Sequence, residues 1–145
     1  MGQPAIDVVI PVYGGYELTA SCLEHLRSQT LSHNAIVVDD ASPDDTPQRV
    51  AREFPEVQLL RQPANRGFAS ACNRGIAESS GEFVVLLNND VDARPDFLAQ
   101  LVAPLRDDER LGSVAALLVR PGGARIDSLG LTADRTGAAF ARMQG

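Results

Sequence analysis

The chain has 145 residues, 44% of them hydrophobic, and a net charge of −6. This length suits one domain with a hydrophobic core, and the acidic excess argues against nucleic acid or an anionic membrane surface as the main partner. The sequence contains no lysine, which excludes a P-loop lysine, a Schiff-base lysine and the lysine of a kinase strand. Any phosphate must therefore be held by arginine, backbone N–H groups or a metal ion.

The cysteines and histidines predict neither a disulfide nor a zinc site. Cys22 and Cys72 fall on the apolar stripes of two different predicted helices, which favours buried thiols in a reducing compartment. His25 and His33 have no acidic or thiol ligand beside them at metal-binding spacing. The first residues lack the pattern of a signal peptide, and no apolar run approaches the roughly 20 residues of a membrane helix. We expect a soluble, cytoplasmic protein.

Predicted strands and helices alternate along the chain. In order they are a strand at 5–10, a helix at 16–29, a strand at 35–38, a helix at 47–54, a strand at 57–60, a helix at 68–79, a strand at 83–87, a helix from 94, a strand at 114–119 and a short strand near 126. This alternation predicts an α/β fold with a Rossmann-like, mostly parallel sheet and helices on both faces. Pro11 is expected to end the first strand.

The apolar spacing also predicts which residues are buried. The strand at 83–87 is a continuous apolar run, which is typical of a strand buried on both faces. Helical spacing predicts a buried face on the helices at 16–29 and 68–79, made by Leu18, Cys22, Leu23, Leu26, Phe68, Ala71, Cys72, Gly75 and Ile76.

Polar residues follow three of the predicted strands. They are Tyr13, the pair Asp39-Asp40, and the run Asn88-Asn89-Asp90. In open α/β sheets ligands bind at the carboxyl ends of the strands, so these residues should converge on one cleft. A carboxylate beside a tyrosine ring suits the imide N–H and the flat face of a pyrimidine base. Asp90 with Asn88 or Asp92 offers oxygen ligands for Mg²⁺ or Mn²⁺.

Five motifs occur in an order that resembles the family 2 glycosyltransferases. They are Val9-Ile10-Pro11-Val12-Tyr13, Ser28-Gln29-Thr30, Val37-Val38-Asp39-Asp40-Ala41-Ser42, Asn65-Arg66-Gly67-Phe68-Ala69 with Asn73-Arg74-Gly75, and Leu86-Leu87-Asn88-Asn89-Asp90. Together they cover about residues 6 to 98. The last motif and the later Pro121-Gly122-Gly123 are most similar to the rhamnosyltransferase-like branch.

The resemblance implies a GT-A fold and assigns site residues by position. Those expected to bind the nucleotide are Pro11, Val12, Tyr13, Asp39, Asp40, Asn65, Arg66 and Gly67. Asp40 would accept the base N–H, and the last three residues would form a loop over the nucleotide. Asp90 matches the metal-binding acid of the family's D-x-D motif, Asn88 replaces its first acid, and Asp92 is a possible second ligand. The expected cofactor is Mg²⁺ or Mn²⁺.

The resemblance also implies an activity. It is transfer of a sugar, with inversion, from a UDP- or dTDP-sugar such as dTDP-rhamnose to a glycan or lipid-linked acceptor, in cell-wall or polysaccharide biosynthesis. Residues 1–145 would be the donor-binding half, with 120–145 starting the acceptor-side region. The catalytic base is expected beyond residue 145, and neither Asp127 nor Asp134 is preferred for it. Any peripheral membrane association would involve regions outside this chain.

Two other functions are consistent with parts of the pattern. A binding module could hold a nucleotide sugar without turnover. A signalling receiver domain would share the doubly wound pattern, but it needs an acidic pair after the first strand and a late lysine, and both are missing. Simpler roles are consistent with several of these residues: Asp44 and Asp45 suit helix capping, Tyr13 could be a packing residue, and Asp92 could be a solvated turn residue.

Overall fold

The computed structural model describes residues 6–120, 126–128, 131–133 and 139–141. The chain divides into two compact units, Met1–Ala99 and Gln100–Gly145. The first contains a parallel sheet with three helices, and it carries every described residue of the predicted site. The second contains most of α4 (Phe97–Asp107) and two short antiparallel pairs.

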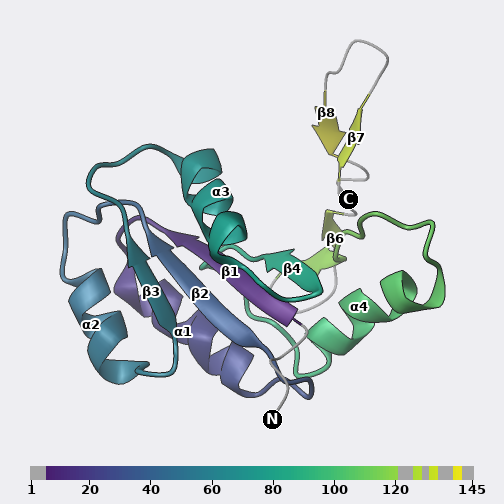
Figure 1. Ribbon diagram of the computed structural model, residues 1–145, viewed down its shortest axis with the longest axis horizontal. Coiled ribbons are helices and arrows are strands. Elements are labelled where there is room, and N and C mark those ends of the chain that lie inside the picture. The colour runs from purple at the N-terminus through teal and green to yellow at the C-terminus, as the bar shows by residue number, and fades with distance from the viewer. Residues whose placement is uncertain (1–5, 121–125, 129–130, 134–138, 142–145) are drawn as a thin grey trace. The chain divides into compact units, whose positions relative to one another are not determined.

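The sheet of the first unit has four parallel strands in the order β3-β2-β1-β4. Their bounds are Gln58–Arg61, Asn34–Asp39, Ile6–Val12 and Phe83–Leu86 (Figure 1). Val9 of β1 pairs with Ile36 on one side and with Leu86 on the other. All seven residues of β1 are buried, as expected for a central parallel strand covered on both faces. The predicted parallel sheet is confirmed, and β1 is its centre.

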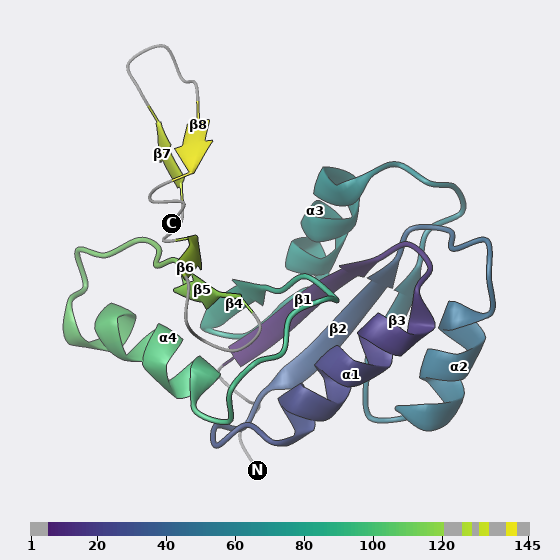
Figure 2. The same ribbon diagram turned by 180° about the vertical axis from the view of Figure 1, so that it is seen from behind.

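Helices cover both faces of this sheet, as predicted. α1 (Tyr16–Arg27) and α2 (Thr46–Glu53) lie on one face and α3 (Phe68–Glu78) lies on the other, which is seen by comparing Figures 1 and 2. α3 sits close to the strands because Gly75 faces them without a side chain. A Cβ atom at Gly75 would lie 2.2 Å from Cγ1 of Val9 and 3.2 Å from Cγ2 of Val38.

The prediction that Pro11 ends the first strand is wrong. β1 continues to Val12, and Pro11 pairs with Val38. The Leu87 N–H donates to the Val9 carbonyl over 2.9 Å, so alternate residues of β1 direct their N and O atoms toward β4. Pro11 is the next such residue, and β4 has already ended there. The missing N–H of proline therefore costs no ladder hydrogen bond.

Four burial predictions are also wrong. β4 is the edge strand of the described sheet, and Val84 and Leu86 are 41% and 51% exposed. On the helices, Leu18, Phe68 and Ile76 are exposed. In α1 the buried stripe is formed by other residues, Tyr16 and Thr19 among them. Spacing alone predicts that a helix has an apolar face, but it does not fix where that face begins and ends.

The second unit contains β5 (Leu118–Val119), β6 (Ile126–Ser128), β7 (Leu131–Ala133) and β8 (Ala139–Ala141). β5 pairs with β6 and β7 with β8, both antiparallel. The strand predicted at 114–119 forms only at its last two residues, where β6 provides a partner. α4 begins at Phe97, later than predicted. Within the described ranges, no helix combines the length and the apolar character needed to span a bilayer.

A buried carboxylate closes the amino end of the sheet. Asp7 is 2% exposed, and its Oδ2 accepts the N–H groups of Ser80 and Gly81 over 2.7 and 2.8 Å. Its Oδ1 accepts the side-chain amide of Asn34 over 2.9 Å. Burial acts to raise the pKa of Asp7, but these three hydrogen bonds together outweigh burial and lower it. Asp7 thus ties the loop before β4 to β1 and β2 in its ionised form.

This arrangement predicts a loss of stability in acid. Because the pKa of Asp7 is lower in the folded state, its contribution is complete above the pKa of a free aspartate, roughly 4, and disappears as the pH falls through the folded value. Asp7→Asn should lower the free energy of unfolding by about 2–3 kcal/mol at pH 7. Urea unfolding across pH should show the difference from wild type narrowing below pH 4. A difference that is constant with pH would contradict this role.

The contact at Gly75 predicts a second effect on stability. Gly75→Ala should lower the free energy of unfolding by about 1–3 kcal/mol, because the added methyl overlaps Val9, although alanine favours a helix. Gly112→Ala is the matched control, since a Cβ there meets nothing within 4 Å. Urea unfolding of both variants tests this, and equal stabilities would show that α3 does not pack as described.

Candidate functional site

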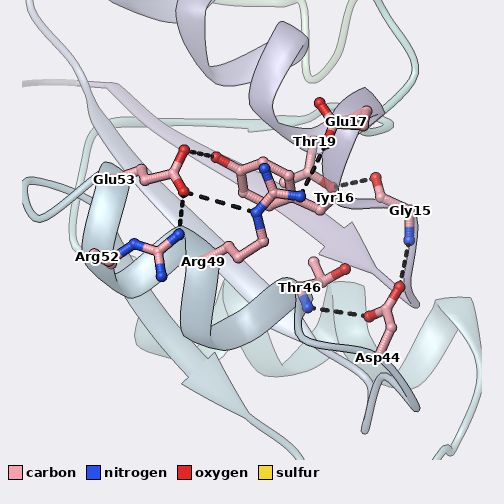
Figure 3. A network of polar contacts seen from close by, with 9 residues as sticks. All are labelled: Gly15, Tyr16, Glu17, Thr19, Asp44, Thr46, Arg49, Arg52 and Glu53. Carbon is pink, nitrogen blue, oxygen red and sulfur yellow. Dashed lines mark hydrogen bonds and ion pairs between the residues drawn. The ribbon is translucent and has the colours of Figure 1, made fainter.

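The turn after β1 is held by the loop after β2. The Gly14 N–H donates to Ser42 Oγ over 2.7 Å, and the Gly15 N–H donates to Asp44 Oδ2 over 3.1 Å (Figure 3). Both glycines have positive φ, 68° and 75°, which side chains disfavour. Asp44 also accepts the N–H of Thr46 at the start of α2, whereas Asp45 at the N-cap position makes no side-chain capping bond. The capping role is therefore confirmed for Asp44 and wrong for Asp45.

Asp40 joins the end of β2 to the loop between β3 and α3. It is 4% exposed. Its Oδ1 accepts the Gln62 side-chain amide over 2.9 Å and the Arg66 N–H over 2.8 Å, and its Oδ2 accepts the Gly67 N–H over 2.7 Å. Gly67 has φ 85° and precedes α3, and its N–H is also 3.1 Å from Asn65 Oδ1. One carboxylate thus fixes the whole loop at 65–67.

Asp39 lies beneath this site. It is completely buried, and its Oδ1 accepts the Ser42 N–H over 3.2 Å. Its Oδ2 lies 3.2 Å from Nε of Arg61, close enough for an ion pair although no hydrogen bond forms. The adjacent Ala41 adopts a left-handed backbone, φ 59°, which is strained for alanine. Asp39 therefore supports the loop that presents Asp40 and Ser42.

A cavity of about 230 Å³ opens between these loops. Its lining residues come from the end of β1, the end of β2 and the start of α3, and they are Pro11, Val12, Tyr13, Asp40, Asn65, Gly67, Phe68 and Ala71. Tyr13 and Phe68 are 57% and 61% exposed, so two aromatic rings offer faces to a ligand. An acidic acceptor and exposed aromatic faces suit a flat heterocycle that carries an N–H donor.

The turn after β4 carries the predicted metal ligands. Exposure alternates along it: Asn88, Asp90 and Asp92 are exposed, whereas Leu87 and Ala93 are buried. Asp90 makes no hydrogen bond or ion pair within the part of the chain that the structure describes, so its carboxylate is available. Asp92 Oδ1 accepts the Ser21 hydroxyl over 3.2 Å and lies 3.5 Å from Nδ1 of His25, so it contacts α1.

This donor set fits a hard cation that completes its coordination with a substrate. The available groups are carboxylate and amide oxygens, the ligands that Mg²⁺ and Mn²⁺ accept. Among the described residues, no group of three His, Cys, Asp or Glu side chains forms a closed metal site. A metal held here would rely on Asp90 and on oxygen atoms from outside the protein, as substrate phosphates can supply.

The turn after β4 that carries Asn88, Asp90 and Asp92 is named the metal turn here. Cys22 lies against it but is not a nucleophile. Its Sγ donates to the Asn88 carbonyl over 3.7 Å. Burial, followed by the negative charges of Asp90 and Asp92, raises the pKa of the Cys22 thiol to about 12. A thiol that stays protonated at neutral pH is unreactive. Cys22 and Cys72 are both free and buried, which confirms the prediction for their thiols.

Six of the eight predicted nucleotide residues line the cavity, and Asp39 and Arg66 do not. Asp39 is buried, and Arg66 donates its backbone N–H to Asp40. Two residues were missed: Phe68, which was assigned to a buried helix face, and Gln62, which binds Asp40. The signal for Phe68 was its position directly after the Asn-Arg-Gly turn. Nothing in the sequence pointed to Gln62.

Comparison with known proteins identifies the family. The family model described as Glycosyl transferase family 2 matches residues 7–142. The chain belongs to this family. The sheet, its flanking helices and the similar solved structures confirm the GT-A type of fold for this family 2 chain.

Two solved structures and one curated protein illustrate the similarity. A mannosyltransferase from Pyrobaculum calidifontis in complex with GDP-Man and Mn²⁺ has a TM-score of 0.72 and 30% identity, over 83% of this chain and 37% of that one. Glucosyl-3-phosphoglycerate synthase from Mycobacterium tuberculosis, with Mn²⁺, UDP and glucosyl-3-phosphoglycerate, has a TM-score of 0.59 and 26% identity, over 70% and 39%. Dolichol-phosphate mannosyltransferase of Pyrococcus furiosus is 30% identical over 115 residues, covering 74% of this chain and 32% of that protein. The chain spans about a third of the length of the curated relatives it matches.

The hydrogen bonds of Asp40 predict that it supports the fold as well as the site. Asp40→Ala should lower the free energy of unfolding by about 2–3 kcal/mol, because three donors lose a charged acceptor. Asp45→Ala is the matched control: this exposed neighbour precedes α2 without a side-chain capping bond, and its loss should cost under about 0.5 kcal/mol. Urea unfolding of the two variants tests this, and equal stabilities would contradict the role of Asp40.

Proposed function

We propose that this chain is the donor-binding half of a glycosyltransferase that takes its sugar from a nucleoside diphosphate sugar. The observation that carries the proposal is the cavity at the ends of β1 and β2, whose lining includes Tyr13, Phe68 and Asp40. The turn with Asp90 follows β4, the strand next to β1 in the sheet. A nucleoside site and an acidic turn on adjacent parallel strands suit a donor that has a base at one end and a diphosphate at the other.

The bonds of Asp40 favour a pyrimidine base. A carboxylate has about four acceptor positions, and three of those on Asp40 are taken by Gln62, Arg66 and Gly67. The remaining position, on Oδ2, suits the single imide N–H of uracil or thymine. Guanine would present two adjacent donors, and the second would have no acceptor. We therefore propose a UDP- or dTDP-sugar as the donor.

The diphosphate would be neutralised without lysine. Asp90, with Asn88 and Asp92 on the same exposed side of the turn, would hold Mg²⁺ or Mn²⁺. When bound, such an ion supplies positive charge for the departing diphosphate. Arg66 is the cation nearest in sequence to the cavity lining, its side chain is exposed, and its backbone is fixed by Asp40. We propose that its guanidinium contacts a phosphate.

The proposals for the donor sugar, the stereochemistry and the acceptor rest on the sequence motifs. We propose a rhamnosyltransferase-like activity, with dTDP-rhamnose as a donor, an inverting reaction and a glycan or lipid-linked acceptor. Residues 120–145 would start the acceptor-side region, and most of them lie outside the described residues. The position of the catalytic base, beyond residue 145, stays a prediction. Of the two acids weighed for it, Asp134 lies outside the described residues and Asp127 has no described side chain.

Removal of Asp90 tests the metal assignment. Asp90→Ala should abolish the increase in nucleotide affinity that Mn²⁺ produces, which is a loss of about tenfold or more. The metal-free affinity and the stability of the fold should stay unchanged, because the Asp90 side chain is exposed and has no partner within the described residues. Isothermal titration with UDP, dTDP and GDP, with and without MnCl₂, gives these values, and UDP or dTDP should bind more tightly than GDP.

Glu82→Ala is the control for this experiment. Glu82 is an exposed acid at the other end of β4, so its removal changes the net charge equally without touching the site. Its Mn²⁺-dependent affinity should equal that of wild type. If Asp90→Ala retained full Mn²⁺-dependent affinity, the metal assignment would be wrong. If wild type bound none of the three nucleotides, the donor-binding function would be wrong.

A further inference from the structure

The metal turn contacts α1 through Asn89, the residue between the ligand candidates Asn88 and Asp90. Asn88 and Asp90 are exposed, whereas Asn89 between them is half-buried. The side-chain amide of Asn89 donates to Oγ1 of Thr19 over 3.0 Å. Thr19 lies in the first turns of α1 and is completely buried. The half-buried Asn89 between the two exposed ligand candidates therefore bonds a residue 70 positions away in the sequence.

The same threonine contacts the turn after β1. Thr19 Oγ1 lies 3.4 Å from the Gly15 carbonyl, and Figure 3 shows that the Gly15 N–H is in turn held by Asp44. A hydroxyl has one donor and two acceptor positions, so it can donate to Gly15 and accept from Asn89 together. The bond to Gly15 is the ordinary bond of a helical threonine to the carbonyl four residues earlier. The bond from Asn89 is not, since it comes from another loop.

Thr19 thus lies between the two parts of the proposed donor site. The turn it contacts at Gly15 follows directly after Tyr13, which lines the nucleoside cavity. The turn it contacts at Asn89 carries Asp90. A chain of two hydrogen bonds, from Asn89 to Thr19 to Gly15, therefore links the two turns. Two further contacts from α1 reach the same turn, from Cys22 to the Asn88 carbonyl and from Ser21 to Asp92. The side chain of Asp90 does not contribute to this link, because it has no partner within the described residues.

We propose that Thr19 and Asn89 are positioning residues for the metal ligand. They hold the backbone of the turn so that the carboxylate of Asp90 stands at a fixed distance from the nucleoside cavity. This rests on the proposed function of the same site. Ligand-supporting hydrogen bonds of this kind typically change metal affinity by 10–100-fold, because an exposed ligand that is not held must be ordered when the metal binds.

Thr19→Val tests the proposal, since it removes the hydroxyl and keeps the branched shape. The Kd of UDP, or of dTDP or GDP if either binds wild type more tightly, is measured with and without MnCl₂. We expect the Mn²⁺-dependent gain in affinity to fall about tenfold, while the metal-free Kd changes less than about twofold. Thr19→Ser, which restores the hydroxyl, should recover the gain. A merely structural role would not separate these two Kd values.

Two further variants guard against a general loss of packing. Thr46→Val removes another buried hydroxyl of the same unit, one at the start of α2 that makes no contact with the turn after β4, and it should leave both Kd values unchanged. Asn89→Ala removes the other partner from a half-buried position, so it serves even if Thr19→Val does not fold. The double variant should lose no more than the stronger single variant, because both changes break one bond.

The outcomes are distinct. A full Mn²⁺-dependent gain in Thr19→Val, or in Asn89→Ala if Thr19→Val does not fold, would overturn the positioning role and leave the proposed function intact. An equal loss with and without Mn²⁺ would also overturn it, since that is the behaviour of a damaged fold. Nucleotide binding by wild type that is independent of Mn²⁺ would refute the metal assignment and, with it, the proposal.

Discussion

The candidate site depends on the carboxylate of Asp40 and the three donors that it holds. Gln62 and the N–H groups of Arg66 and Gly67 converge on it, so the end of β2, the end of β3 and the start of α3 are fixed relative to one another. The cavity is the space left between these elements and the end of β1. Because the bonds are made with a buried charge, their loss is costly. The same carboxylate keeps one acceptor position, so the group that shapes the cavity also limits which base enters it.

Acidic side chains hold loops throughout this unit. Asp7 accepts two backbone N–H groups at one end of the sheet, and Asp39, Asp40 and Asp44 accept others at the opposite end. Two of these N–H groups belong to Gly15 and Gly67, whose positive φ turns them toward Asp44 and Asp40. The turn after β4 differs, because Asp90 is left free and a neutral pair, Asn89 and Thr19, provides the anchor. Because neutral side chains hold this turn, the carboxylate of Asp90 stays available for a metal ion.

Local patterns predicted the alternating elements and the parallel sheet, because apolar periodicity reports which segments pair and pack. Of the three polar strand ends, those with Tyr13 and Asp40 line one cavity, and the convergence of Asn88-Asn89-Asp90 on it stays a prediction. The same patterns failed to predict burial and side-chain contacts that depend on residues far away in the sequence. β4 was expected to be buried on both faces, but a continuous apolar run does not reveal the position of a strand in the sheet. Phe68 was assigned to the core because its spacing is helical, yet it lines the cavity. The contacts of Gln62 with Asp40 and of Asn89 with Thr19 have no sequence signal, since polar residues 22 and 70 positions apart meet only in the fold.

The central claim is that one donor molecule spans the cavity and the turn after β4. A crystal structure of the protein with UDP or dTDP and Mn²⁺, with the manganese located by its anomalous scattering, tests it most directly. The account predicts the base between Tyr13 and Phe68 with its imide N–H on Asp40, and manganese coordinated by Asp90 and by phosphate oxygens of the same nucleotide. Manganese bound to other residues, or a base outside the cavity, would contradict it.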